Sequence, residues 1–218
     1  MQNETGRPTI ISRALLLLGP TGAGKTPLGE IIEQRGLWDT TCLHFDFGAN
    51  LREVVRRNRP DQWISRQDIE FLTEVLRSGA LLENEHFPIA ERILQSFAVA
   101  RNVDERTCIV LNGLPRHVGQ ARAIDALLKV KAVVHLRCSC ETVFQRIHSN
   151  VGGDRTDRID DDREAIRKKL AIFDERTAPL LDHYTCQNAQ IETIEVTAQM
   201  TPTQMWEILN QRRKQPAD

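Results

Sequence analysis

The sequence contains no long apolar run and carries almost no net charge. Its longest apolar segment, ALLLL at residues 14–18, is far shorter than the roughly 20 residues that a membrane-spanning helix needs. Lysine and arginine together number 29, and aspartate and glutamate number 30, which gives a net charge of −1. No overall field favours nucleic acid or an anionic membrane, so we expect neither as a partner.

The sequence also lacks the cysteine spacing of a metal site and the pattern of a secretory signal. The five cysteines are Cys42, Cys108, Cys138, Cys140 and Cys186. They include no CxxC pair, and their spacing is not that of a four-ligand metal site. The opening residues, MQNETGRPTI, contain no basic segment followed by an apolar one. We therefore expect no secretory signal and a cytoplasmic location.

The stretch GPTGAGKT at residues 19–26 has the P-loop form GxxxxGK[ST], between an apolar strand and a helical pattern. Its glycines allow backbone N–H groups to converge on phosphate oxygens, and the helix that follows presents a partial positive charge. Lys25 would reach the terminal phosphates, and Thr26 would offer its hydroxyl to Mg²⁺. The residues expected to contact the nucleotide here are Gly19, Thr21, Gly22, Ala23, Gly24, Lys25 and Thr26.

The apolar patterning predicts alternating strands and helices. Strands are expected at residues 14–18, 41–45, 107–111, 132–136 and 191–196. Helices are expected at residues 24–35, 49–57, 65–77, 88–100, 118–128, 141–149, 162–181 and 203–211. The alternation predicts an α/β fold, with a parallel sheet covered by helices on both faces. The successive helices within residues 49–100 predict a small helical insertion.

A second motif, IVLNGLPRHVGQA at residues 109–121 followed by Asp125, resembles the signature of the adenylate kinase family. That signature is [LIV]-D-G-[FY]-P-R, followed by Q-A and a later Asp. Asn112 stands where the family has Asp, and Leu114 where it has an aromatic residue. The segments FGANLR at 47–52, GALL at 79–82 and RIDD at 158–161 are similar to three further segments of the family. The resemblance extends from about residue 14 to residue 196.

The resemblance implies a P-loop NTPase fold, a three-layer sandwich around a five-stranded parallel sheet, in a single kinase domain over residues 1–218. Its core would comprise about residues 10–46, 103–149 and 161–211. A helical insertion that binds the nucleoside monophosphate would lie at about 47–102, and a short lid at about 150–160. The implied activity is phosphoryl transfer from ATP to a nucleoside monophosphate, with AMP favoured, in a monomeric enzyme that uses Mg²⁺.

The resemblance also implies a role for each matching residue. The acceptor would be bound by Gly48, Arg52, Ala80, Leu82, Gly113, Arg116, Gln120 and Arg158. The transferred group would be stabilised by four cations, Lys25, Arg116, Arg158 and Lys169, because negative charge spreads over its oxygens. The donor nucleotide would also meet Arg146, and the metal would face Thr26 and Asn112. The family has a further arginine at the position of Asn150; Arg155, in the same loop, would substitute for it at the donor nucleotide.

Several departures from the family's pattern leave other functions open. Asn112 brings no negative charge to the metal, for which either Asp46, at the end of the second strand, or Asp160 and Asp161 would compensate in part. Phe47 stands where the family has a threonine that contacts adenine, and Lys169 replaces an arginine and loses its bidentate geometry. A second hypothesis is therefore a nucleotide-binding protein of the same fold with weakened catalysis. A third is a P-loop kinase of another small molecule; a GTPase is disfavoured because no NKxD motif occurs.

Overall fold

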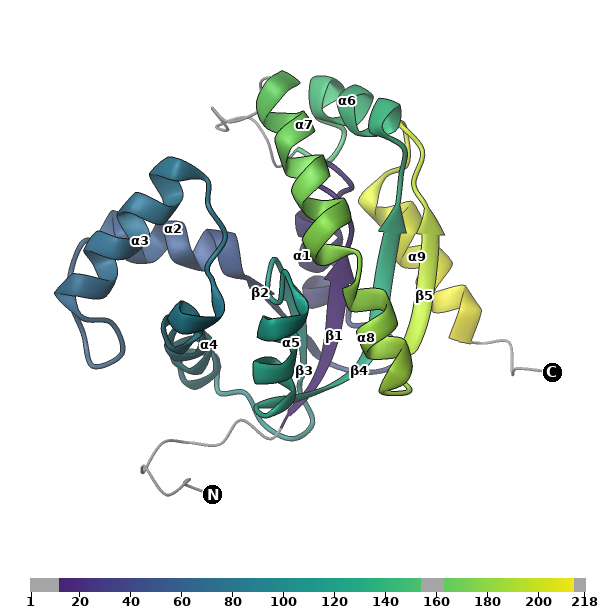
Figure 1. Cartoon of the computed structure of the whole chain (residues 1–218). Coiled ribbons are helices and arrows are strands. Elements are labelled where there is room, and N and C mark those ends of the chain that lie inside the picture. Colours follow the sequence, from purple (N-terminus) through teal and green to yellow (C-terminus); the bar gives the residue numbers. More distant parts are fainter. Residues whose placement is uncertain (1–11, 154–162, 214–218) are drawn as a thin grey trace.

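The computed structural model describes residues 12–153 and 163–213. Its centre is a five-stranded sheet with the order β2-β3-β1-β4-β5, in which every pairing is parallel. The carboxyl ends of the strands therefore lie at one edge of the sheet (Figure 1). The strands are β1 (Ser12–Leu18), β2 (Cys42–Asp46), β3 (Cys108–Asn112), β4 (Leu128–Arg137) and β5 (Gln190–Glu195). The predicted α/β fold with a five-stranded parallel sheet is confirmed.

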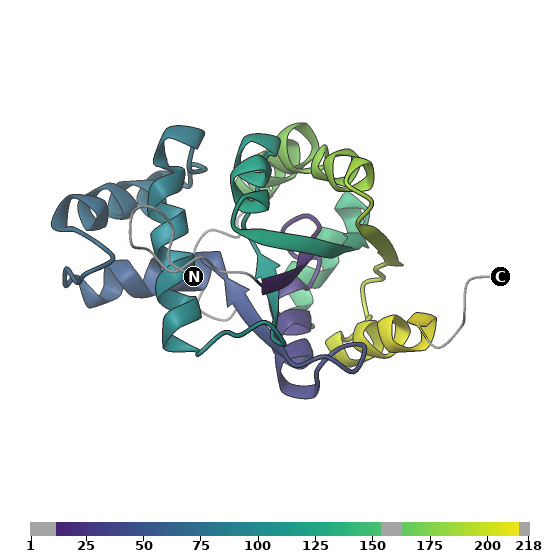
Figure 2. The same ribbon diagram turned by 90° about the horizontal axis from the view of Figure 1, so that it is seen from below.

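Helices cover both faces of this sheet. Figure 2 shows α1 and α9 on one face and α5, α7 and α8 on the other. The helices are α1 (Lys25–Arg35), α2 (Phe47–Arg57), α3 (Arg66–Ser78), α4 (Phe87–Ala100), α5 (Val118–Asp125), α6 (Cys140–Ser149), α7 (Arg163–Ile172), α8 (Leu180–Cys186) and α9 (Pro202–Arg213). Within the described residues, none of them combines the length and the apolar character that crossing a membrane requires.

Strand β1 illustrates why the sheet is covered on both sides. Leu15 and Leu17 pack in the cluster that contains α1 and α9. Leu16 and Leu18 pack in the other cluster, with α4, α5 and α8. All four side chains are at most 2% exposed. Since successive side chains of a strand point to opposite faces, an unbroken apolar run such as this one is typical of a strand buried on both sides.

The prediction of one helix over residues 162–181 is wrong. Helix α7 ends at Ile172, a π-helical turn follows at Phe173–Thr177, and α8 begins only at Leu180. Pro179 accounts for the break, because it has no N–H to donate and its ring crowds the preceding turn. The consequence is a bend that brings the π-helical turn to the edge of the sheet where the strands end.

The helix predicted at residues 118–128 also ends early, at Asp125. Leu128 already belongs to β4, where it pairs with Ser12 of β1. From Leu128 to Ala132, buried and exposed side chains alternate, which is the period of a strand that faces solvent on one side. This alternation is the sequence signal that distinguishes the start of β4 from the end of a helix.

Helices α2, α3 and α4 lie between β2 and β3 in the sequence, and α2 and α3 extend beyond the β2 edge of the sheet (Figure 1). Ser65 and Asp68 form a capping box at the start of α3. Helix α4 is anchored to the sheet, where Phe97 packs edge-on against Phe45 with 5.1 Å between ring centroids. The division into core, insertion and lid stays a prediction, and most of the predicted lid lies outside the described residues.

Candidate active site

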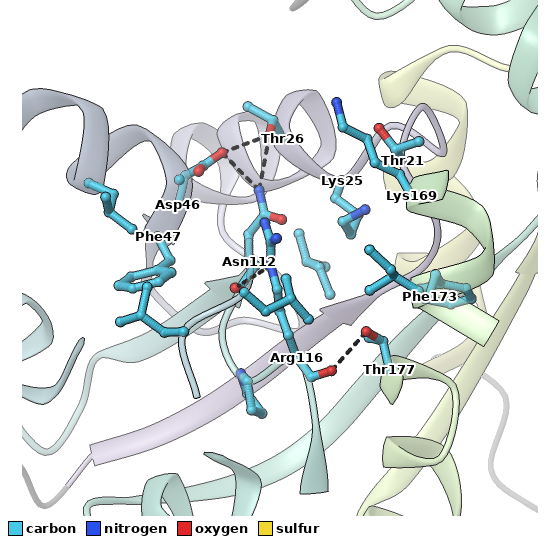
Figure 3. A pocket seen from close by; sticks show the side chains of 18 of the residues that line it. Thr21, Lys25, Thr26, Asp46, Phe47, Asn112, Arg116, Lys169, Phe173 and Thr177 are labelled. Carbon is cyan, nitrogen blue, oxygen red and sulfur yellow. Dashed lines mark hydrogen bonds between the residues drawn. The ribbon is translucent and has the colours of Figure 1, made fainter. Parts of the chain in front are cut away.

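A cleft of about 300 Å³ opens where the strands end, between the P-loop, α2, α3 and α7. Figure 3 shows side chains from all of these elements except α3 pointing into it. The predicted site residues that line it are Gly19, Thr21, Gly22, Gly24, Lys25, Thr26, Gly48, Arg52, Ala80, Leu82, Asn112, Gly113, Arg116, Gln120 and Lys169. The sequence therefore pointed to residues from five separate segments that the fold brings to one cleft.

Of the predicted site residues that the structure describes, Ala23 and Arg146 do not line this cleft. Ala23 is a fully buried residue of the P-loop, and Arg146 lies on α6 with 2% of its surface exposed. Arg155 and Arg158 lie outside the described residues. Their predicted contacts with nucleotide stay predictions.

The P-loop leads directly into the first turn of α1. Gly24 caps this helix with φ 96°, in the left-handed region that favours glycine. The first turn contains no acidic residue, so nothing there offsets the partial positive charge at the helix N-terminus. Pro27 is the third helical residue, where an N–H would have no partner within the helix in any case. The segment is thus built to receive an anion.

The side chain of Lys25 folds back onto the P-loop. Its Nζ donates to the carbonyl oxygens of Gly19 and Pro20, each at 2.7 Å. The ammonium group is thereby held at the centre of the loop, beside the N-terminus of α1 (Figure 3). A phosphate oxygen that enters the loop meets a cation already in place.

Thr26, Asp46 and Asn112 form a hydrogen-bonded cluster beside the P-loop (Figure 3). The Thr26 hydroxyl donates to Asp46 Oδ2 at 2.7 Å. The amide Nδ2 of Asn112 donates to Asp46 Oδ2 and lies equally near Thr26 Oγ1, at 3.0 Å in each case. Asp46 and Asn112 are partners in the parallel register of β2 and β3, so their side chains end at the same level of the sheet.

His44 packs beneath this cluster. Its Nε2 lies 3.3 Å from Nδ2 of Asn112, and its ring occupies the space that a side chain on Gly29 of α1 would need. Burial lowers the pKa of the His44 imidazole, although the Asp46 and Glu33 carboxylates act in the opposite direction. The neutral ring can accept a hydrogen bond at Nε2, which suits an amide N–H from Asn112.

Arg52 and Arg116 also line the cleft, and both residues are exposed. Arg52 comes from α2, and Arg116 from the loop after β3. Arg116 is held in place through its backbone, since its N–H donates to Gln120 Oε1 and its carbonyl accepts from Thr177 Oγ1, both at 2.8 Å. The cleft thus contains two planar cations besides the P-loop lysine, and such cations suit phosphate oxygens.

Gln120 is 2% exposed and already makes two hydrogen bonds within the protein. Besides accepting from Arg116, it donates from Nε2 to the carbonyl of Leu82 at 2.8 Å. One N–H and one lone pair of its amide remain for a ligand. Phe47, by contrast, is 5% exposed and packs beside Phe45, so at that position the cleft offers an apolar ring and no hydrogen bond.

Arg146 contacts backbone rather than the cleft. Its Nε donates to the carbonyl of Gly22 at 3.1 Å, and its Nη1 to those of Thr197 and Met200 at 2.8 and 2.7 Å. The guanidinium group thus ties the P-loop to the segment after β5. A contact with the donor base stays a prediction.

Sequence reasoning raised Asp46 only as partial compensation for the charge missing at Asn112, and it did not mark Thr177 at all. For Asp46 a signal existed, because it ends β2 just as Asn112 ends β3. For Thr177 there was none, since its position depends on the π-helical turn. Among the described residues, no group of three or more His, Cys, Asp and Glu side chains is able to hold a metal. A metal here therefore needs ligands from a bound nucleotide as well.

Comparisons with known proteins agree with this geometry. A family model described as AAA domain matches residues 15–167. An adenylate kinase of Rhodopirellula baltica is 33% identical over 179 residues, which are 79% of this chain and 82% of that protein. An adenylate kinase of Nitrobacter hamburgensis is 31% identical over 194 residues, 83% of either chain. One of Prochlorococcus marinus is 30% identical over 177 residues, 78% of this chain and 82% of that protein.

Proposed function

We propose that this chain, which belongs to the adenylate kinase family, transfers the γ-phosphoryl group of ATP to AMP and releases two molecules of ADP. The family makes the chain a phosphotransferase; the choice of AMP is the proposal. The observation that carries it is the charge arrangement of one cleft. Lys25 at the P-loop, Arg52 and Arg116 all line it, and both arginines are exposed. Such a cleft fits two phosphate-bearing molecules with their phosphates facing each other.

Phosphoryl transfer of this kind depends on positioning and on cationic stabilisation, because the protein itself forms no covalent bond. The P-loop N–H groups and Lys25 hold the phosphates of the donor. Arg52 and Arg116 hold the phosphate of the acceptor, whose oxygen attacks the γ-phosphorus as the bond to the β-phosphate oxygen breaks. Lys169 of α7 lines the same cleft and adds a further positive charge to the transferred group.

Mg²⁺ fits the oxygen donors beside the P-loop, since it binds one or two carboxylates together with substrate phosphates. Thr26 supplies a hydroxyl there and Asp46 a carboxylate oxygen; Asn112, which the resemblance implied as a metal contact, turns its amide nitrogen toward both of them. When bound, the metal neutralises charge on the donor phosphates. The chain's own residues would orient the donor, and closure of the cleft would exclude water that otherwise hydrolyses ATP.

A coupled assay of ADP formation tests the proposal, with ATP and Mg²⁺ supplied together with AMP, CMP, UMP, GMP or dTMP. We expect AMP to accelerate ADP formation most strongly. Lys25→Ala should lower this rate by at least about 10²-fold. The matched control is Lys168→Ala, which removes an exposed lysine of α7 that does not line the cleft, and it should leave the rate unchanged.

Two other outcomes would replace the proposal. Strong acceleration by another monophosphate would identify that nucleotide as the acceptor. Phe47 would then be the first residue to test for a role in selecting its base. Tight ATP binding with no acceleration by any monophosphate would instead favour a nucleotide-binding protein with weakened catalysis, or a kinase of another small molecule.

A further inference from the structure

We infer that Asp46 supplies the carboxylate that holds Mg²⁺ beside Thr26, and that Asn112 is the residue that positions it. This inference rests on the proposed binding of ATP at the P-loop. It makes Asp46 a metal ligand, although the family signature does not include this residue. It also gives Asn112 a different role from the one that its place in that signature implies.

The first observation concerns the charge of Asp46. Among the described residues that line the cleft, it is the only acidic side chain. The others that carry charge there are Lys25, Arg52, Arg116 and Lys169, all of them positive. Mg²⁺ bound to nucleotide is held in proteins by one or two carboxylates, and within the described cleft Asp46 alone provides one.

The second observation is the direction of its oxygens. Oδ2 accepts from the Thr26 hydroxyl at 2.7 Å, and Thr26 follows Lys25 at the N-terminus of α1. Oδ1 accepts from the backbone N–H of Ala49 at 2.8 Å and so caps α2. The amide of Asn50 donates to the carbonyl of Asp46, also at 2.8 Å. The carboxylate is therefore fixed with one oxygen at the P-loop threonine.

The third observation concerns Asn112, which is 4% exposed. Its Nδ2 lies 3.0 Å from Asp46 Oδ2 and 3.3 Å from His44 Nε2, so acceptors surround the amide nitrogen. A carboxylate in place of this amide would put two negatively charged groups in contact. The amide instead donates a hydrogen bond to Asp46 Oδ2. Of the two strand ends, only that of β2 therefore carries a carboxylate, on Asp46, and that of β3 carries the amide of Asn112.

The test measures metal binding rather than turnover. The dissociation constant of Mn²⁺ is measured by electron paramagnetic resonance in the complex of the protein with the ATP analogue AMPPNP. Asp46→Asn keeps an oxygen that caps α2 but removes the charge, and we expect roughly tenfold or more weakening of Mn²⁺ binding. The affinity for AMPPNP without metal should not fall, because the change removes a negative charge near the phosphates.

Two further variants sharpen the result. Asp39→Asn removes one negative charge at the opposite end of β2, at an exposed turn residue with φ 58°, and should leave Mn²⁺ binding unchanged. The double variant Asp46→Asn with Asn112→Asp moves the carboxylate to the neighbouring strand end, still beside Thr26. We expect it to regain most of the Mn²⁺ affinity that Asp46→Asn loses. Thermal unfolding of each variant checks that the fold is intact.

Equal Mn²⁺ affinity in the wild-type chain and in Asp46→Asn would overturn the inference, and so would the absence of metal-dependent AMPPNP binding in the wild-type chain. The proposed function is tested separately, by AMP-dependent ADP formation. A chain that binds Mn²⁺ through Asp46 but transfers no phosphoryl group would contradict the function and leave this assignment standing. If Asp46→Asn instead transfers the phosphoryl group and binds Mn²⁺ as well as the wild-type chain does, the proposed function stands and the assignment of Asp46 to the metal is wrong.

Discussion

The hydroxyl of Thr177 donates a 2.8 Å hydrogen bond to the backbone carbonyl of Arg116. It joins the π-helical turn after α7 to the loop after β3, across 61 positions of sequence. Close by, Arg176 of the same turn pairs with both oxygens of Glu83 at 2.6 and 2.8 Å. The turn thus contacts both the loop that carries Arg116 and the segment that follows α3.

Thr177→Val keeps the shape of the side chain and removes this hydrogen bond. A neutral hydrogen bond contributes about 0.5–1.5 kcal/mol, so we expect kcat/KM for AMP to fall by roughly two- to tenfold. Thr185→Val is the control, since the Thr185 hydroxyl bonds only to the preceding turn of its own helix. Identical kinetics in the two variants would show that the Thr177 bond does not position Arg116.

Gln120→Leu should destabilise the chain as well as weaken acceptor binding. The substitution removes the side-chain acceptor of the Arg116 N–H and one of two partners of the Leu82 carbonyl, which also lies 3.2 Å from His117 Nε2. An unsatisfied buried group costs about 1–3 kcal/mol. Urea unfolding measures the resulting loss in the free energy of unfolding. Gln145→Leu, on the exposed face of α6, should cost far less. Unchanged stability together with a raised KM for AMP would instead assign Gln120 to the ligand alone.

Lys169→Arg should raise kcat. Lys169 lines the cleft from α7, and an arginine there would meet phosphate oxygens in pairs where lysine acts as a point charge. A gain of up to about tenfold corresponds to about 1.4 kcal/mol of transition-state stabilisation. Steady-state kinetics at saturating ATP and AMP provide the measurement. Equal or lower kcat in the variant would count against a role for this side chain in transfer.

Gly29→Ala should destabilise the chain, although alanine in a helix is ordinarily favoured over glycine by about 1 kcal/mol. A Cβ at this position of α1 would lie 2.3 Å from the His44 ring, and relieving such overlap costs about 1–3 kcal/mol. Combining it with His44→Ala removes the obstacle, so within that background Gly29→Ala should stabilise. Urea unfolding of the wild-type chain, the two single variants and the double variant tests whether the effect of Gly29→Ala on the free energy of unfolding changes sign.

Arg146→Met should lower stability by several kcal/mol. The guanidinium group is buried and donates to three backbone carbonyls on either side of it, each of which would lose its partner at about 1–3 kcal/mol. We expect a large drop in the midpoint of thermal unfolding. A variant that melts like the wild-type chain but binds ATP poorly would show that Arg146 serves the nucleotide instead.

Most of the fold could be predicted from the sequence because the buried strands are short apolar runs and the P-loop marks where the first one ends. The bend between α7 and α8 escaped prediction, since the apolar spacing continues through it and only Pro179 signals the break. The early start of β4 was missed because Leu127 and Leu128 continue the helical spacing from Ile124, and the alternation that marks the strand begins only at Leu128.

The site was partly predictable for a different reason. Motif residues such as Lys25 and Arg116 follow strand ends, and parallel strands all end at one edge of the sheet. The cluster of Thr26, Asp46 and Asn112 depends on the register of β2 against β3. Register is a property of the packed sheet, and neither motif contains it. Arg155 and Arg158 stay predictions, because they lie outside the described residues.

The fate of the γ-phosphoryl group tests the central claim most directly. The enzyme is supplied with ATP labelled with ³²P at the γ-position, unlabelled AMP and Mg²⁺, and the products are separated by chromatography. Transfer to AMP predicts that the label appears in ADP, with little in inorganic phosphate, and that Lys25→Ala abolishes it. Label that appears only in inorganic phosphate, or that stays in ATP, would contradict a kinase that acts on AMP.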